Sequence, residues 1–213
     1  MPKTIEEKLS EGRQYRAFDI GIKQRAEGDE SMRVTGYAST FNNPYVLYSE
    51  PGYTIREQID PGAFAECDRD DVIMQYDHMG RVFARTSNGT LTTFVDAVGL
   101  GMEAELSGTD IGRQLYQEID GGYTTKMSFG FKVGERRREV TENEETGETD
   151  ILITITKITK LYDVSAVSLP ANDATSISAR SFAEGVIREV REEIQAEKER
   201  RRKIQRIKIL TEV

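Results

Sequence analysis

Three side chains of the 213-residue sequence have the types that nucleophilic acyl chemistry needs. Ser128 lies within a stretch that alternates bulky apolar residues with small or polar ones. His78 directly follows the apolar run VIMQY, and Asp163 lies in the apolar and small segment LYDVSAVS. A serine hydroxyl is a weak nucleophile at neutral pH and needs a base such as imidazole. The base works best when a third group fixes its tautomer. These three residues could supply the three roles if the fold brings them together.

The histidine and cysteine counts exclude several classes of site. The chain has one histidine and one cysteine. Zinc sites with two or three histidines, H-E-x-x-H proteases and Ser-His-His triads are therefore excluded within one chain. A disulfide framework and a multi-cysteine metal site are excluded as well. We expect no metal and no cofactor, and the cysteine usage favours a reducing compartment.

Other interpretations of the same residues stay open at this point. Ser128 could be only a small strand residue, and Asp163 could be an edge charge that discourages aggregation. Asp77 could serve as an exposed acid, although neighbours on a strand point to opposite faces. Cys67 and His78 form a rival nucleophile pair. The acidic residues around Cys67 disfavour it, because they raise a thiol pKa.

The elements that must position these residues are mostly strands. The β-former-rich segments 32–41, 53–59 and 72–76 predict strands, and 90–95 with 100–106 predicts a hairpin across the turn 96–99. One amphipathic helix is predicted over 109–120, capped by Thr109 or Asp110 and stopped by a Gly-Gly pair.

The second half of the chain begins with the strand that carries Ser128. In residues 123–133, Met127, Phe129 and Phe131 share one parity, while Ser128 and Gly130 share the other. This alternation predicts a strand with one bulky apolar face and one small, polar face. Residues 134–150 are expected to form a solvated loop, followed by two β-rich segments, ILITITK and LYDVSAVSLP.

Charge patterning divides the chain. The net charge is −8, but from Glu184 onwards nine Lys or Arg oppose seven Glu, which leaves −10 for the rest. We expect a flexible N-terminal arm (1–30), a β-rich domain (31–180) and a charged amphipathic helical tail (181–213). No apolar run reaches the roughly 20 residues of a membrane span, and no secretory signal is expected. The tract RRRKIQRIK is short and lacks aromatic residues, so nucleic-acid binding is not expected.

The order of the motifs resembles a known family. Across roughly residues 32–179 the chain resembles the tailed-phage prohead serine proteases in the order of six motifs. These motifs are GYASTFN, EQIDPGAF, YDHMGRVFARTSNGTL, VGLGMEAELSGTDIGRQLYQEIDGG, MSFGF and LYDVSAVSLPAN. That family shares its fold with the herpesvirus assemblins. In this resemblance the family's histidine falls on His78, its serine on Ser128 and its acidic position on Asp163.

The resemblance implies a closed antiparallel β-barrel flanked by helices, within a β-rich α+β class. The long charged C-terminal helix is predicted from the amphipathic pattern of residues 181–213. It implies a serine endopeptidase that cleaves scaffold, or the scaffolding segment of the major capsid protein, and itself. The setting would be the host cytoplasm, inside the assembling procapsid. Self-association would resemble the herpesvirus enzymes, and neither nucleic acid nor membrane is an expected partner.

Two departures from the family pattern keep an alternative open. Relatives often place aspartate after the histidine, where this chain has Met79, and the herpesvirus enzymes use a second histidine that this chain lacks. Many relatives carry glutamate at the position of Asp163. The alternative is a non-catalytic capsid-assembly factor that binds capsid protein through its C-terminal helix.

Overall fold

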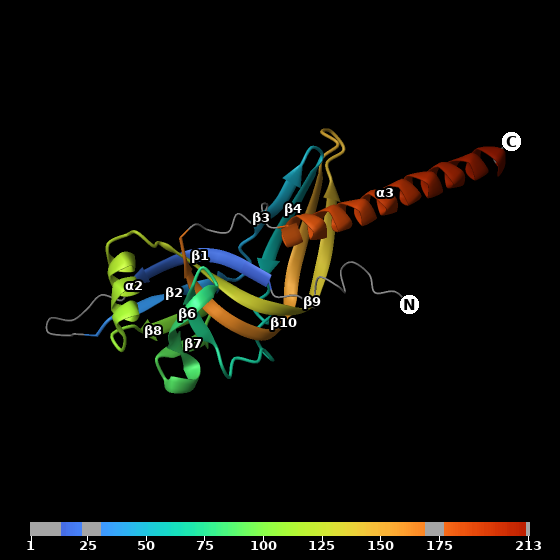
Figure 1. Cartoon of the computed structure of the whole chain (residues 1–213). Coiled ribbons are helices and arrows are strands. Elements are labelled where there is room, and N and C mark those ends of the chain that lie inside the picture. Colours follow the sequence, from blue (N-terminus) through green and yellow to red (C-terminus); the bar gives the residue numbers. More distant parts are fainter. Residues whose placement is uncertain (1–13, 23–30, 169–176, 212–213) are drawn as a thin grey trace.

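The computed structural model describes residues 14–22, 31–168 and 177–211 (Figure 1). Most of the expected N-terminal arm, residues 1–13 and 23–30, lies outside the described residues. Residues 169–176, at the end of the expected β-rich domain, and 212–213 also lie outside them.

The first half of the chain is made of strands. They are β1 (Gln14–Ile22), β2 (Arg33–Thr40), β3 (Tyr45–Glu50), β4 (Tyr53–Ile59), β5 (Ile73–Tyr76), β6 (Met79–Arg85), β7 (Leu91–Val95) and β8 (Gly99–Glu105), with a short 3-10 turn, η1 (Thr86–Asn88), between β6 and β7. The second half contains α2 (Asp110–Asp120), β9 (Lys126–Glu142), β10 (Thr149–Val167) and α3 (Ile177–Thr211).

The two longest strands, β9 and β10, organise the sheet. The strand order is β3-β4-β10-β9-β1-β2-β8-β7, and β5 and β6 branch from β10. β10 pairs antiparallel with β9 along almost its whole length. Its other edge is shared: residues 149–155 pair parallel with β4, and residues 163–166 pair parallel with β5. The expected loop after the Ser128 strand is wrong for residues 134–142, which continue β9.

The expectation of a closed antiparallel barrel is wrong. Within the described residues the strand path ends at β3 on one side and at β7 on the other, and no ladder joins these two edges. β6 and β7 are connected by η1 but are not paired with each other. The two parallel pairings of β10 also make the sheet mixed. The β-rich α+β class and the long C-terminal helix are confirmed.

The main hydrophobic core lies on the side of the sheet opposite Ser128. Its largest fully buried side chains on β9 are Met127, Phe129 and Phe131, and the two phenylalanine rings stack with centroids 4.5 Å apart. Burying each ring is worth about 2 kcal/mol relative to exposure. Helix α2 closes this core with Leu115 and Ile119. Of the two caps predicted from the sequence, Thr109 and Asp110, it is Thr109 that caps the helix, because its hydroxyl accepts from the amide of Gly112.

A second core fixes the beginning of α3. Phe182, Val186 and Val190 pack with Leu47 and Ile55 of β3 and β4, together with other buried residues (Tyr48, Ile151, Ile153, Ala183 and Ile187). Further along the helix the exposure rises, to 43% at Ile204 and 61% at Ile207. Figure 1 shows this later part of α3 extending away from the strands.

The close approach of β8 to β2 gives a test of the fold. A Cβ at Gly99 would lie 1.8 Å from the Ser39 carbonyl oxygen, whereas a Cβ at Gly108 would meet nothing within 4 Å. Gly99→Ala should therefore lower the free energy of unfolding by about 2–3 kcal/mol, because the backbone of β2 must move. Urea denaturation measures it, with Gly108→Ala as the matched control. Equal stability of the two variants would contradict this register of β2 and β8.

Candidate functional site

The register of β9 and β10 places Ser128, Asp163 and Ser165 on one face of the sheet. Ser128 pairs with Ser165, and Gly130 pairs with Asp163. Because side chains alternate along a strand, these residues point away from the core that Phe129 enters. All three side chains are fully buried. Gly130, which pairs with Asp163, contributes no side chain to this face.

His78 lies in the two-residue turn between β5 and β6. Tyr76 pairs with Met79, and the two residues between them both have positive φ, 48° at Asp77 and 58° at His78. Positive φ at both central residues is the geometry of a type I′ hairpin turn, which usually uses Asn-Gly. Without glycine, each such residue costs roughly 1–2 kcal/mol. The chain therefore needs compensating contacts to keep His78 in this conformation.

Asp77 supplies those contacts by anchoring the turn to the end of β10. Its amide donates to the Ala166 carbonyl at 2.9 Å, and its Oδ1 accepts from the Ser168 amide at 2.9 Å. The Ser168 hydroxyl also donates to Oδ2 at 2.9 Å. The Asp77 side chain is thus turned to Ser168, which places it in a supporting role rather than in that of an acid beside His78.

The histidine and the aspartate meet. His78 Nδ1 lies 2.6 Å from Asp163 Oδ1, and the side chains are 14% and 0% exposed. An ionised carboxylate has no proton to donate, so Nδ1 carries the proton of this hydrogen bond. This arrangement fixes the tautomer in which the other ring nitrogen, Nε2, is the acceptor. It is the relation between base and orienting carboxylate that serine hydrolases use.

Ser128 lies on the same sheet face but is not bonded to the base. Its hydroxyl is buried and makes no hydrogen bond within the part of the chain that the structure describes. A buried hydroxyl without a partner costs free energy, so such groups call for an explanation. The structure therefore brings His78 and Asp163 into direct contact and places Ser128 one strand away from Asp163.

The rival nucleophile Cys67 has the wrong environment. Its side chain packs against the main core. Burial raises the pKa of the thiol to about 11, and the positive charge of Arg69 offsets this only in part. The sequence pattern suggested that the neighbouring acidic residues raise the thiol pKa, but burial is the larger cause. A thiol that stays protonated at neutral pH is a poor nucleophile.

Two contributors to the site were missed by the sequence reasoning. Ser165 donates its hydroxyl proton to Asp163 Oδ1 at 2.5 Å, and Ser168 holds Asp77. The parity of LYDVSAVS could have indicated the first, because residues 163 and 165 must share a face. Nothing in the sequence pattern indicated the second, since it depends on where the β5–β6 turn meets β10.

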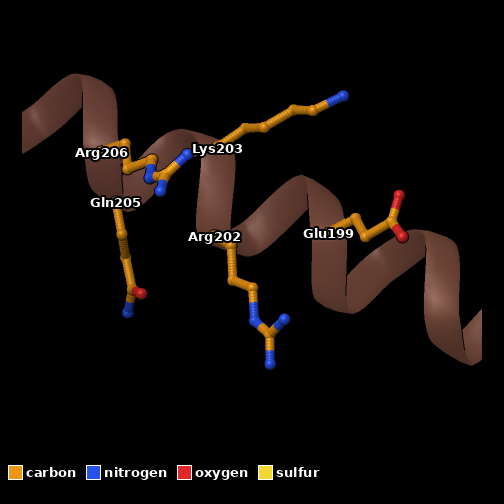
Figure 2. A pocket seen from close by; sticks show the side chains of 5 residues that line it. All are labelled: Glu199, Arg202, Lys203, Gln205 and Arg206. Carbon is orange, nitrogen blue, oxygen red and sulfur yellow. The ribbon is translucent and has the colours of Figure 1, made fainter.

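Two hollows in the surface differ in their relation to this site. One, of about 310 Å³, lies between the β5–β6 hairpin that carries His78 and α2. Its walls are Tyr76, Phe83, Ile111, Gln114, Leu115 and Glu118. The other, of about 470 Å³, is lined only by residues of α3. Figure 2 shows its five side chains spreading from one helix, without a wall from another element. The second is a feature of a charged helix surface, and it is separate from the His78 site.

The described residues contain neither a cluster of metal ligands nor a helix suited to span a membrane. Within residues 14–22, 31–168 and 177–211, no group of three or more His, Cys, Asp or Glu side chains is arranged to hold a metal ion. Among the helices in that part of the chain, none combines the length and apolarity needed to cross a bilayer.

Comparison with known proteins identifies a family. A family model described as caudovirus prohead serine protease matches residues 19–187, which include all three residues singled out from the sequence. No curated protein and no solved structure matches the chain.

The anchoring role of Asp77 is testable through stability. Asp77→Ala removes the carboxylate that accepts from the Ser168 amide and hydroxyl, and leaves a residue that tolerates positive φ poorly, so the free energy of unfolding should fall by about 1–2 kcal/mol. Asp77→Asn keeps an acceptor oxygen and a residue type common at positive φ, and should lose less than half as much. Thermal unfolding followed by circular dichroism measures both. An Asn variant as unstable as the Ala variant would argue against the hydrogen-bond anchor.

Proposed function

The chain belongs to the caudovirus prohead serine protease family, and we propose that it is a capsid-maturation endopeptidase with Ser128 as nucleophile. His78 is the proposed base and Asp163 the carboxylate that orients it. The observation that carries the proposal is the 2.6 Å contact between His78 Nδ1 and Asp163 Oδ1, on the sheet face that also holds Ser128. Family membership supports serine peptidase chemistry, and this contact supports the assignment of roles.

The reaction follows from these roles. The Ser128 hydroxyl attacks the carbonyl carbon of the scissile peptide bond, and His78 Nε2 takes the hydroxyl proton. The imidazolium that forms is stabilised by Asp163 across the Nδ1 hydrogen bond. The same proton then passes to the leaving amine as the C–N bond breaks, which leaves an ester on Ser128. Water, deprotonated by His78, hydrolyses that ester and restores the hydroxyl.

The substrates of the family are capsid or scaffold proteins. For this chain we propose scaffold, or the scaffolding segment of the major capsid protein, and the protease itself, cleaved inside the assembling procapsid. The exposed and highly charged end of α3 supports self-cleavage as one event, because exposed segments with few contacts are the usual sites of nicking.

The burial of Ser128 bears on how this activity would be controlled. The side chain has no exposed surface, and its hydroxyl is not bonded to a base. A substrate carbonyl can reach the Oγ atom only after the covering groups move. We therefore propose that the described conformation is a latent one. Catalytic hydrogen bonds often tighten only in the substrate complex, and here substrate or capsid lattice would complete the Ser128–His78 contact.

Replacement of the nucleophile tests the proposal. Co-expression with the capsid protein, followed by intact-mass spectrometry of both chains, should show discrete truncations with wild-type protein. Ser128→Ala should reduce them by roughly 10⁴-fold, to below detection. Ser39→Ala is the matched control, because Ser39 is equally buried and its hydroxyl also makes no hydrogen bond in the described residues. Truncation that persists in a folded Ser128→Ala protein would exclude this nucleophile.

A second candidate function rests on α3. Residues 199–207 carry five Lys or Arg and one Glu, all exposed, whereas the beginning of the helix is held in the second core. A helix fixed at one end and basic at the other is suited to binding an acidic protein surface. The alternative is therefore a non-catalytic assembly factor that uses α3 to bind capsid protein.

Truncation of the helix separates the two functions. Removing residues 200–213 spares the Lys198–Glu142 ion pair and the second core, so the protein should fold. The assembly factor predicts at least a tenfold loss of incorporation into procapsids, measured by quantitative immunoblotting, with no effect of Ser128→Ala. The protease predicts that Ser128→Ala is incorporated but leaves the capsid protein uncut. Normal incorporation after truncation would rule out the α3 binding role.

A further inference from the structure

Asp163 receives two donors at a single oxygen. Its Oδ1 accepts from His78 Nδ1 at 2.6 Å and from the Ser165 hydroxyl at 2.5 Å. Both Asp163 and Ser165 are fully buried. A carboxylate removed from water keeps its charge only where hydrogen-bond donors replace the lost solvation. The Ser165 hydroxyl therefore helps to keep Asp163 charged where it accepts from His78 Nδ1.

The position of Ser165 in the sheet links the strands that carry the site. On one side it pairs with Ser128 of β9, and on the other with Gln75 of β5, the strand that leads into the His78 turn. Side chains directly opposite on paired strands have Cβ atoms about 5 Å apart. Two serine side chains therefore lie next to each other, one on the strand of the proposed nucleophile and one beside the orienting carboxylate.

The hydrogen bonds distinguish the two serines. Ser165 donates its proton to Asp163, whereas the Ser128 hydroxyl makes no hydrogen bond within the described residues. Ser165 therefore donates to the carboxylate that binds Nδ1 of the imidazole. The nucleophile must instead donate its proton to the other ring nitrogen, Nε2, and the Ser128 hydroxyl is the one whose proton is not already given to Asp163.

We propose that Ser165 is a positioning residue of this site, an inference that rests on the proposed protease function for its consequence in catalysis. Its hydroxyl fixes the Asp163 carboxylate and supports its charge, and the carboxylate in turn fixes His78 with its proton on Nδ1. Ser165 makes no hydrogen bond to the Ser128 hydroxyl within the described residues, and it acts on His78 through Asp163. Loss of its hydroxyl leaves Asp163 Oδ1 with one donor fewer in a buried position, so the Nδ1 hydrogen bond loses its fixed geometry.

The single histidine makes this directly measurable. With a purification tag that contains no histidine, ¹⁵N-histidine labelling of the full chain yields one imidazole, that of His78. The wild-type spectrum should show one hydrogen-bonded Nδ1 proton protected from exchange with water. In Ser165→Ala the exchange should accelerate by roughly tenfold or more, the equivalent of one lost hydrogen bond. Ser165→Thr keeps the hydroxyl and should retain the wild-type exchange rate.

Kinetics provide the second readout, on a peptide that spans the mapped cleavage site. Ser165→Ala should lower kcat roughly 10- to 100-fold, part of the 10²- to 10⁴-fold that a well-placed base contributes, with KM within twofold. Ser165→Thr should restore kcat to within about threefold of the wild type, since the donor is back in place. A serine of only structural importance would lower the melting temperature and leave kcat per folded molecule unchanged.

The outcomes separate this inference from the proposed function. Identical Nδ1 exchange in wild type and Ser165→Ala would overturn the positioning role, and so would the lack of a protected Nδ1 proton in the wild type. If diisopropyl fluorophosphate labels Ser165 and not Ser128, Ser165 is the nucleophile and the positioning role is overturned. If wild type co-expressed with the capsid protein neither cleaves it nor is labelled, while the exchange rates change as expected, the protease proposal fails and the Ser165–Asp163–His78 connection stands.

Discussion

The pairing of β9 with β10 is the constraint on which the rest of the structure depends. It sets Ser128 opposite Ser165 and Gly130 opposite Asp163. A slip of one residue would turn the Ser128 face of β9 toward the core and turn Phe129 and Phe131 out of it, because side chains alternate with a period of two. The stacked phenylalanines thus hold the register in which the polar face is assembled. The site is stabilised from the opposite side of the sheet.

Local features of this arrangement could be predicted from the sequence because local signals specify them. The alternation in residues 123–133 correctly assigned Ser128 and Phe129 to opposite faces. The hairpin formed by β7 and β8 and the Thr109 cap of α2 follow from turn and capping chemistry within a few residues. The contact of His78 with Asp163 was suggested by residue type and family resemblance, and it joins positions 85 residues apart in the chain.

The features that could not be predicted depend on contacts between distant strands. Closure of a barrel requires its two edge strands to pair. The edge strands β3 and β7 are not paired, and no local sequence pattern could have indicated this. Residues 134–142 are polar and read as loop, but they extend β9 because β10 offers them a partner from Thr149 onwards. The Asp77–Ser168 anchor depends on the parallel pairing of β5 with β10, which brings together segments 91 residues apart. Propensity is a weak guide where tertiary pairing decides.

The shared edge of β10 also has a consequence for synthesis on the ribosome. The chain emerges from its N-terminus, so the strands carrying His78 and Ser128 are made before β10 exists. Until β10 is complete, β5 lacks its parallel partner and Asp77 lacks Ser168. His78 then has no contact with Asp163, which is itself part of β10. Long-range pairing of this kind is slow to form, and domains mature from the N-terminal end during translation. The nascent polypeptide therefore lacks the His78–Asp163 contact through most of its elongation, and this contact can form only after β10 has been synthesised.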